Sequence, residues 1–209
     1  VAIFILGIAF YVLLPAEKAP PLLLESNKQR LSNQGYLMVV LFAIYVAGEV
    51  LASMWMSTLI VDKQGLLPEE AALYGIWFFA LIGLSRFFCF LFVKPHWETT
   101  VLKASLLAGI IFGILGQQGY TWALPLIGLL GPFFPLCMAR ISRDFPADWK
   151  AMTVYVSVGI QTMLAIMHQS VGTIADAMGI ENAFLLSPIL LGATFILFHQ
   201  NNRVSRKQA

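Results

Sequence analysis

Charged residues are scarce in this chain. Only 11% of its 209 residues are Asp, Glu, Lys or Arg, whereas 59% are hydrophobic. A soluble domain carries about 25% charged residues, and a globule of this length cannot bury so much apolar surface. The low charge therefore excludes a soluble enzyme, a disordered regulator and a nucleic-acid-binding protein. A mean hydropathy of +0.79 instead indicates an integral membrane protein.

Cysteine pairs and catalytic motifs are also missing. Cys89 and Cys137 lie far apart in apolar runs, and the chain has no CxxC pair or Cys/His cluster. We therefore predict no metal site, no disulfide and no cofactor. The motifs GxSxG, HExxH, GxxxxGK[ST] and GxGxxG are absent, so the chain is not predicted to be an enzyme. Asp144 and Asp148 lie in a basic segment and are interpreted as solvated charges.

Six apolar stretches are long enough to cross a bilayer, which takes about 20 mostly apolar residues. They cover Gly35–Ile60, Leu73–Val93, Leu102–Gln118, Trp122–Cys137, Met152–Ile174 and Ala183–Phe198. The shorter stretch Val1–Leu14 has neither an initial Met nor a basic flank, so it is interpreted as the end of a preceding sixth transmembrane helix. The predicted fold is an all-α, polytopic transmembrane helical bundle, with six helices in residues 35–200.

Basic residues concentrate in alternate connections between these stretches. Eleven of the 13 fall on one side, namely Lys18, Lys28, Arg30, Lys94, Lys103, Arg140, Arg143, Lys150, Arg203, Arg206 and Lys207. Because basic loops stay in the cytoplasm, we predict a cytoplasmic linker at 15–34 and a cytoplasmic basic tail at 201–209. A long linker before six helices is typical of transporters with two six-helix halves. We therefore expect a multi-pass protein of a bacterial-type inner membrane, with an N-terminal half-bundle as partner.

Ionisable side chains inside a span are costly unless they are paired or line a cavity. Glu49 lies in the outer half of its span. It is interpreted as a cavity-facing carboxylate that binds substrate hydroxyls or a coupling proton or cation, or as part of a structural ion pair. Arg86 lies nearer the inner face and is interpreted as a structural residue near a cytoplasmic gate. His168 shares a helix face with Gln161, and it is either a proton relay or a hydrogen-bonded packing residue.

Proline and tryptophan add two further hypotheses. Pro125, Pro132 and Pro135 fall within one span, which predicts a bent helix suited to a gate or a shaped cavity wall. Trp55 either stacks on a sugar ring or serves as an anchor or packing residue. The small-residue stripe at Gly109–Gly116 predicts close helix packing.

Four motifs together resemble a known family. They are Tyr45-Val46-Ala47-Gly48-Glu49-Val50 followed by Trp55, Ser85-Arg86 at the end of the next span, Gly131-Pro132-Phe133-Phe134-Pro135, and Gly172-Thr173-Ile174-Ala175-Asp176 followed by Gly179. In this order, they make Gly35–Phe198 similar to the C-terminal half of sugar transporters of the major facilitator superfamily, in particular the fucose/glucose/galactose–proton symporters. One departure is Met163–His168, where that family has a Gly-Gly-Ala-x-x-Pro run.

The resemblance implies secondary active transport by alternating access, in which a sugar or another small polar solute moves with a proton or sodium. Its small-molecule substrate or coupling ion is then expected at Glu49, Trp55, Gln161 and His168. Arg86, Pro132 and Pro135 are expected to serve gating or structure. Two alternatives stay open: efflux of a drug or metabolite, and a truncated, non-transporting membrane fragment or subunit.

Overall fold

The computed structural model describes residues 31–146 and 148–208, and within them the fold is entirely helical. The elements are α2 (Asn33–Gln64), α3 (Pro68–Phe92), η1 (Pro95–Trp97), α4 (Glu98–Gln117), η2 (Thr121–Leu130), α5 (Phe133–Asp144), α6 (Trp149–Met178), α7 (Ile180–Phe184) and α8 (Leu186–Gln208). Taken with their short continuations, they form six helices long and apolar enough to cross a membrane. The predicted all-α, multi-pass membrane bundle is confirmed. The predicted helix end at Val1–Leu14 and most of the linker lie outside the described residues.

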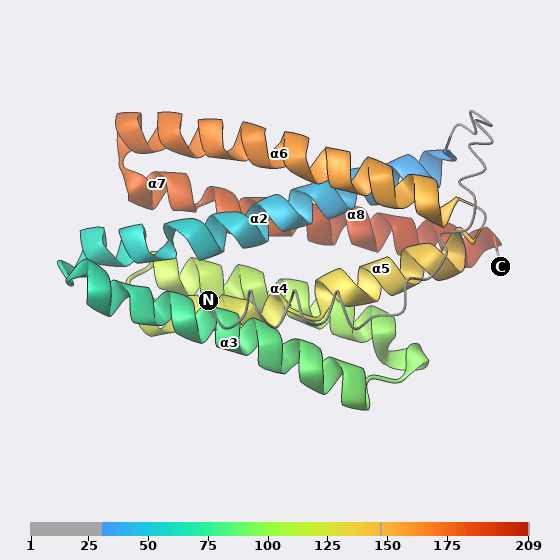
Figure 1. Ribbon diagram of the computed structural model, residues 1–209, viewed down its shortest axis with the longest axis horizontal. Coiled ribbons are helices and arrows are strands. Elements are labelled where there is room, and N and C mark those ends of the chain that lie inside the picture. Colours follow the sequence, from blue (N-terminus) through green and yellow to red (C-terminus); the bar gives the residue numbers. More distant parts are fainter. Residues whose placement is uncertain (1–30, 147, 209) are drawn as a thin grey trace, which may run out of the picture. The chain divides into compact units, whose positions relative to one another are not determined.

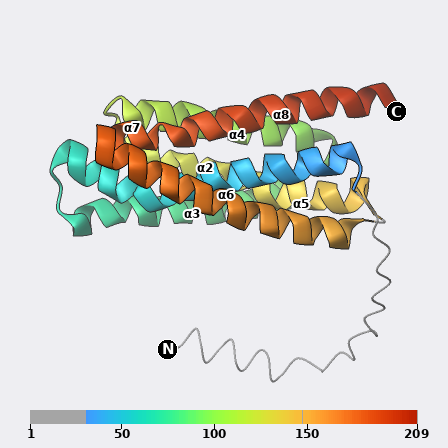
Figure 2. The ribbon, with the colours of Figure 1, turned by 90° about the horizontal axis from the view of Figure 1, so that it is seen from above.

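Helix α2 contacts more of the bundle than any neighbouring helix, because α3, α6, α7 and α8 all pack against it (Figures 1 and 2). It starts where the Ser32 hydroxyl accepts a hydrogen bond from Gly35 N at 3.1 Å, and it stops at Gly65, whose φ is +64°. Both caps satisfy backbone groups that the helix leaves open. The helix is therefore longer at both ends than the predicted Gly35–Ile60.

Glycines let η2 approach its neighbours closely. A Cβ added at Gly109 of α4 would lie 2.7 Å from Leu130, and one added at Gly131 would lie 2.6 Å from the Ile82 carbonyl of α3. Both separations are far below van der Waals contact. At Gly131 the neighbour is backbone, so only glycine fits, whereas at Gly109 the Leu130 side chain would have to move. The close packing predicted for the α4 stripe is found, with η2 as the partner.

The proline-rich span is broken rather than bent. Pro125 lies inside the 3₁₀-helix η2, a turn follows at Gly131 and Pro132, and the α-helix α5 begins at Phe133. Proline has no N–H to donate, so prolines in one span interrupt the hydrogen-bond ladder. The interruption lies well inside the bundle, between α3 and α4.

The last two transmembrane passes meet at Gly179, whose φ of +88° turns the chain from α6 into α7. The five-residue α7 leads into α8, which runs on to Gln208. Residues 201–208, expected as a separate tail, therefore continue the last helix.

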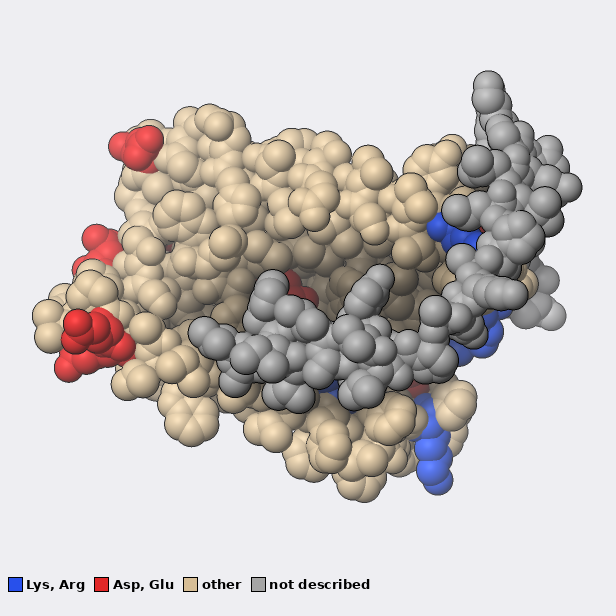
Figure 3. Space-filling model, viewed as in Figure 1, with Lys and Arg blue, Asp and Glu red and all other residues tan. Residues whose placement is uncertain are grey.

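On the face that Figure 3 shows, acidic side chains gather at one end of the bundle and basic side chains at the other. Asp62, Glu69 and Glu70 lie where α2 ends and α3 begins, whereas Arg140 and Arg143 lie at the far end of α5. We call these the acidic end and the basic end. The separation agrees with the charge pattern of the sequence, while the orientation across the membrane stays a prediction.

Candidate functional site

The broken span leaves backbone carbonyls open in the interior of the bundle. In a continuous α-helix, the carbonyls of Gly128 and Gly131 would accept from residues 132 and 135, but both of these are prolines. Gly128 O instead accepts from Gly131 N at 3.1 Å within the 3₁₀ turn, and both carbonyls accept hydrogen bonds from adjacent residues of α3. Ser85 Oγ donates to Gly128 O at 3.2 Å, and Arg86 Nε donates to Gly131 O at 3.0 Å.

The carboxylate of Glu49 lies at the same place. Glu49 is near the midpoint of α2, and the hydroxyl of Tyr45, one turn earlier, donates a hydrogen bond to its Oε2. Tyr45 is fully buried, and its hydroxyl also lies 3.3 Å from Leu130 O. Glu49 Oε1 is 3.6 Å from Arg86 Nη2. The site is therefore an ion pair set against the end of η2.

This pairing changes the interpretation of two predicted residues. The sequence places Glu49 in the outer half of one span and Arg86 near the inner end of the next. They meet because α2 is long, α3 runs antiparallel to it, and the arginine side chain spans the remaining distance. Arg86 is therefore part of the same site as Glu49, and the pair matches the structural ion pair that the sequence left open for Glu49.

Aromatic rings form one wall of the site. The Phe133 ring lies 4.3 Å from the Tyr45 ring between centroids, and the Arg86 guanidinium lies 5.9 Å from the centroid of Phe134. Phe42 in turn packs on Phe134, with centroids 4.9 Å apart. An apolar wall lowers the local dielectric and strengthens the attraction between the two charges.

Most of the N–H groups of Arg86 donate no hydrogen bond within the described residues. A guanidinium has five N–H groups, and only the one on Nε makes a hydrogen bond with the described residues. The 3.6 Å separation from Glu49 is an ion pair but too long for a hydrogen bond. The Arg86 side chain is 41% exposed, against 15% for Glu49. The site can therefore accept a further ligand on its arginine side.

The other predicted binding residues lie elsewhere. Trp55 packs half-buried against the core, and its Nε1 has no hydrogen-bond partner among the described residues. On α6, Gln161 is exposed and His168 is half-buried. The structure does not join any of these three to Glu49, so their roles in binding stay predictions. Pro132 is buried at the break, and Pro135, three residues later on α5, is exposed.

Sequence reasoning missed Tyr45 and the carbonyls of Leu130 and Gly131 as members of the site. Two signals were available in the sequence. Tyr45 precedes Glu49 by four residues, which places both on one helix face. Pro132 and Pro135 follow Gly128 and Gly131 by four residues, which removes the normal donors to those carbonyls.

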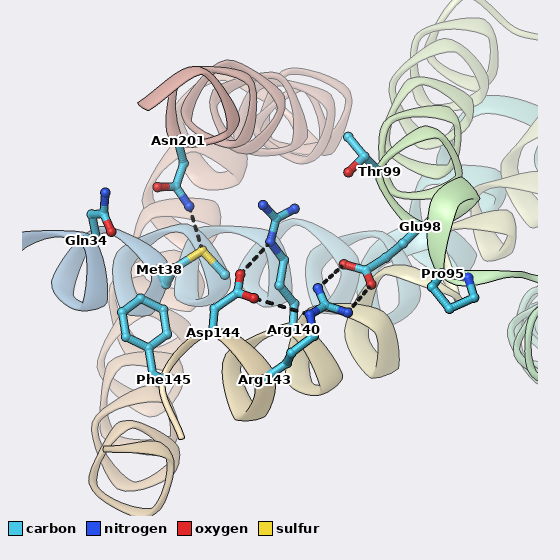
Figure 4. A pocket seen from close by; sticks show the side chains of 10 residues that line it. All are labelled: Gln34, Met38, Pro95, Glu98, Thr99, Arg140, Arg143, Asp144, Phe145 and Asn201. Atoms are coloured by element: carbon cyan, nitrogen blue, oxygen red, sulfur yellow. Dashed lines mark hydrogen bonds and ion pairs between the residues drawn. The ribbon is translucent and has the colours of Figure 1, made fainter. Parts of the chain in front are cut away.

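A second polar region is a cavity of about 730 Å³ at the basic end (Figure 4). Glu98, at the start of α4, is 7% exposed and holds Arg143 with two hydrogen bonds. Arg143 Nη1 lies 2.8 Å from Glu98 Oε2, and Nη2 lies 3.1 Å from Oε1. The pair links the start of α4 to the end of α5.

Asp144 extends this cluster. Its carboxylate accepts from Arg140 Nε at 3.1 Å and from Arg143 Nε at 3.3 Å. Asp144 is exposed, which agrees with its interpretation as a solvated charge, and it also pairs with both arginines at the end of α5. The charges of the two acidic and two basic groups cancel, so we interpret the cluster as a structural link between α4 and α5 and call it the clasp. The described residues contain no group of three or more His, Cys, Asp or Glu side chains that could hold a metal ion.

Comparison of the chain with family models, with curated proteins and with solved structures gives no match. The similarity to the major facilitator superfamily therefore stays a prediction from the motifs. The multi-pass membrane fold does not depend on it, because it follows from the six apolar helices themselves.

Proposed function

We propose that this protein is a secondary active transporter that moves a small polar solute across the membrane with a proton or sodium ion. The observation that carries the proposal is a partly exposed Glu49–Arg86 pair beside an interrupted helix within an apolar bundle. Ionisable residues inside a membrane mark substrate or ion pathways by default. Transporters build their sites at such interrupted helices, whose free carbonyls and helix ends meet ligands.

In this proposal Glu49 binds the coupling proton or sodium, or a hydroxyl of the solute. Pro132 and Pro135 keep the span interrupted, which leaves Gly131 O able to accept from Arg86 Nε. The position of Arg86 therefore depends on this interruption as well as on α3. A second bundle covers the site, and the two bundles rock around it in an inner membrane with the C-terminus in the cytoplasm. The resemblance to sugar transporters favours a sugar as the solute.

The test is uptake into membrane vesicles from cells that produce the protein, compared with vesicles that lack it. Radiolabelled sugars and other small polar solutes are offered under an imposed proton or sodium gradient. We expect accumulation of at least one solute, driven by one of the two gradients. Counterflow of hydrophobic cations in the same vesicles would instead support efflux.

The matched variants are Glu49→Gln and Glu69→Gln. Glu69 is an exposed carboxylate at the acidic end of the same bundle, so its loss should leave uptake unchanged. We expect Glu49→Gln to abolish gradient-driven accumulation, because an amide cannot exchange a proton or neutralise a cation. Normal uptake by Glu49→Gln at every pH contradicts the assigned role.

A further inference from the structure

We infer that Arg86 binds an oxyanion of the transported solute, so that the substrate class is a small carboxylate or phosphate compound. The inference rests on the proposed function and, among its small polar solutes, names an anionic class in place of the neutral sugar that the resemblance favours. It comes from the hydrogen bonds of the site, in which the Nη donors of Arg86 are unused.

Two acceptors at the site are already engaged. Gly131 O accepts from Arg86 Nε, and Glu49 Oε2 accepts from the Tyr45 hydroxyl, whose single proton also lies within reach of Leu130 O. A neutral sugar presents hydroxyl donors as well as acceptors, so it matches a site of unused donors only in part. A carboxylate or phosphate needs donors alone.

The free donors are those of the Arg86 guanidinium. Neither Nη nitrogen makes a hydrogen bond with residues 31–146 or 148–208, and the side chain is 41% exposed. Planar guanidinium groups match carboxylate and phosphate oxygens in a bidentate fork, which a hydroxyl cannot reproduce. Exposure of this charge to lipid would be costly, so the open side of Arg86 faces water or a ligand.

Glu49 holds the arginine loosely enough to exchange. Its nearest oxygen is 3.6 Å from Arg86 Nη2, whereas Arg143 is held by Glu98 through two bonds of 2.8 and 3.1 Å. An arriving oxyanion can therefore take the Nη donors while Nε stays on Gly131 O. The displaced carboxylate is then free to bind the coupling cation, which would tie solute binding to ion binding.

The experiment measures protection of Arg86 from phenylglyoxal, which modifies guanidinium groups. The full chain in detergent is treated with the reagent in the presence of inorganic phosphate, succinate or glucose, and peptide mass spectrometry gives the rate at each arginine. A protecting ligand at four times its Kd should slow modification of Arg86 about fivefold. Arg143 is the internal control, because its Nη atoms are already engaged, and its rate should not change.

The outcomes separate the two proposals. Protection of Arg86 by phosphate or by succinate, but not by glucose, supports the oxyanion site and distinguishes the two anion classes. Equal protection by glucose, or no protection by either anion, overturns it. If no anion protects Arg86 but gradient-driven sugar uptake is intact, the oxyanion site is overturned and the proposed transport is not. If an anion protects Arg86 but no solute is taken up, the proposed transport is overturned and the oxyanion site is not.

Substitutions at Glu49 and Arg86 test the inference through the direction in which anion affinity changes. Because Glu49 competes for the guanidinium, Glu49→Gln should tighten binding of the protecting anion by about threefold or more. Arg86→Lys keeps the charge but loses the fork, so anion binding measured by equilibrium dialysis should weaken. Weaker anion binding by Glu49→Gln would overturn the exchange, since Glu49 would then be holding the anion site together.

Discussion

The molecule contains two glutamate–arginine pairs, and they are built differently. At the basic end, Glu98 is 7% exposed and takes two hydrogen bonds from Arg143, which also meets Asp144. Inside the bundle, Glu49 and Arg86 are 3.6 Å apart and share no hydrogen bond. The first pair engages all three nitrogens of its arginine, which we call saturated, and in the second only Nε of the arginine makes a hydrogen bond.

The difference follows from what surrounds each pair. The basic-end pair joins regular helix ends, where side chains are free to reach their best geometry. Arg86 is held away from Glu49 by its bond to Gly131 O, a carbonyl that Pro135 leaves open. A saturated pair stabilises one structure, whereas an unsaturated pair can change partners. Stability should therefore depend on the first pair and ligand binding on the second.

The largest expected effect is on stability, from Arg143→Gln. The change leaves the buried Glu98 carboxylate unpaired, which should cost about 3 kcal/mol, at the low end for buried pairs because the arginine is half-exposed. Thermal unfolding in detergent measures it as a lower Tm. The exposed Lys94→Gln at the same end should change nothing, and Glu98→Gln added to Arg143→Gln should recover much of the loss. An unchanged Tm would show that the clasp is not structural.

Gly131→Ala tests whether the break needs close contact with α3. The added Cβ would lie 2.6 Å from the Ile82 carbonyl, so the two segments must separate, at a cost of about 1–3 kcal/mol. Gly83→Ala is the control, because nothing lies within 4 Å of a Cβ at that position of α3. Alanine there should stabilise the helix by about 0.5–1 kcal/mol. The same sign of Tm shift for both variants would argue against the contact.

Tyr45→Phe removes the hydroxyl that lies between Glu49 and Leu130 O. The ring still fits its buried position, so we expect a loss of about 1 kcal/mol from the missing hydrogen bonds. Chemical unfolding monitored by tryptophan fluorescence measures the change. Tyr36→Phe is the matched control, since Tyr36 is exposed and its hydroxyl makes no hydrogen bond in the described part of the chain. Equal losses for the two variants would remove Tyr45 from the site.

The smallest expected effect is the coupling between Glu49 and Arg86 in a double-mutant cycle. With Gln at each position, we expect a coupling energy below about 1 kcal/mol, as for other loosely held, partly exposed pairs. The same cycle at Glu98 and Arg143 should give a clearly larger value. Equal coupling energies at the two sites would mean that the pairs do not differ, and that Arg86 is not available for exchange.

The sequence predicted the six helices well because their signal is local. Hydropathy over about 20 residues depends only on the residues in that window. The helix ends were predicted less closely, since Ser32, Gly65 and Gly179 act through capping and turning geometry that hydropathy does not register. The proline-rich span was predicted to bend, and it breaks instead because Pro132 and Pro135 have no N–H to continue the helical hydrogen bonds.

The candidate site was predicted only in part. Glu49 was identified because a carboxylate in an apolar run stands out by itself. Its partners could not be identified, because depth along one helix does not say which side chain of another helix faces it. Gln161 and His168 stood out as polar residues in a span, as Glu49 did, and Trp55 stood out as an aromatic residue near Glu49. Among the described residues none of the three shares a hydrogen bond or ion pair with Glu49.

The sequence by itself determined a multi-pass helical membrane protein, since long apolar stretches with so few charges are stable only in a lipid bilayer. It also determined that the carbonyls of Gly128 and Gly131 would lose their α-helical donors, because proline has no N–H wherever it lies. Only the tertiary structure decided that Arg86 takes one of those carbonyls and meets Glu49 at the same time. That depends on the tilt, length and rotation of three helices, which are properties of their packing and not of any one segment.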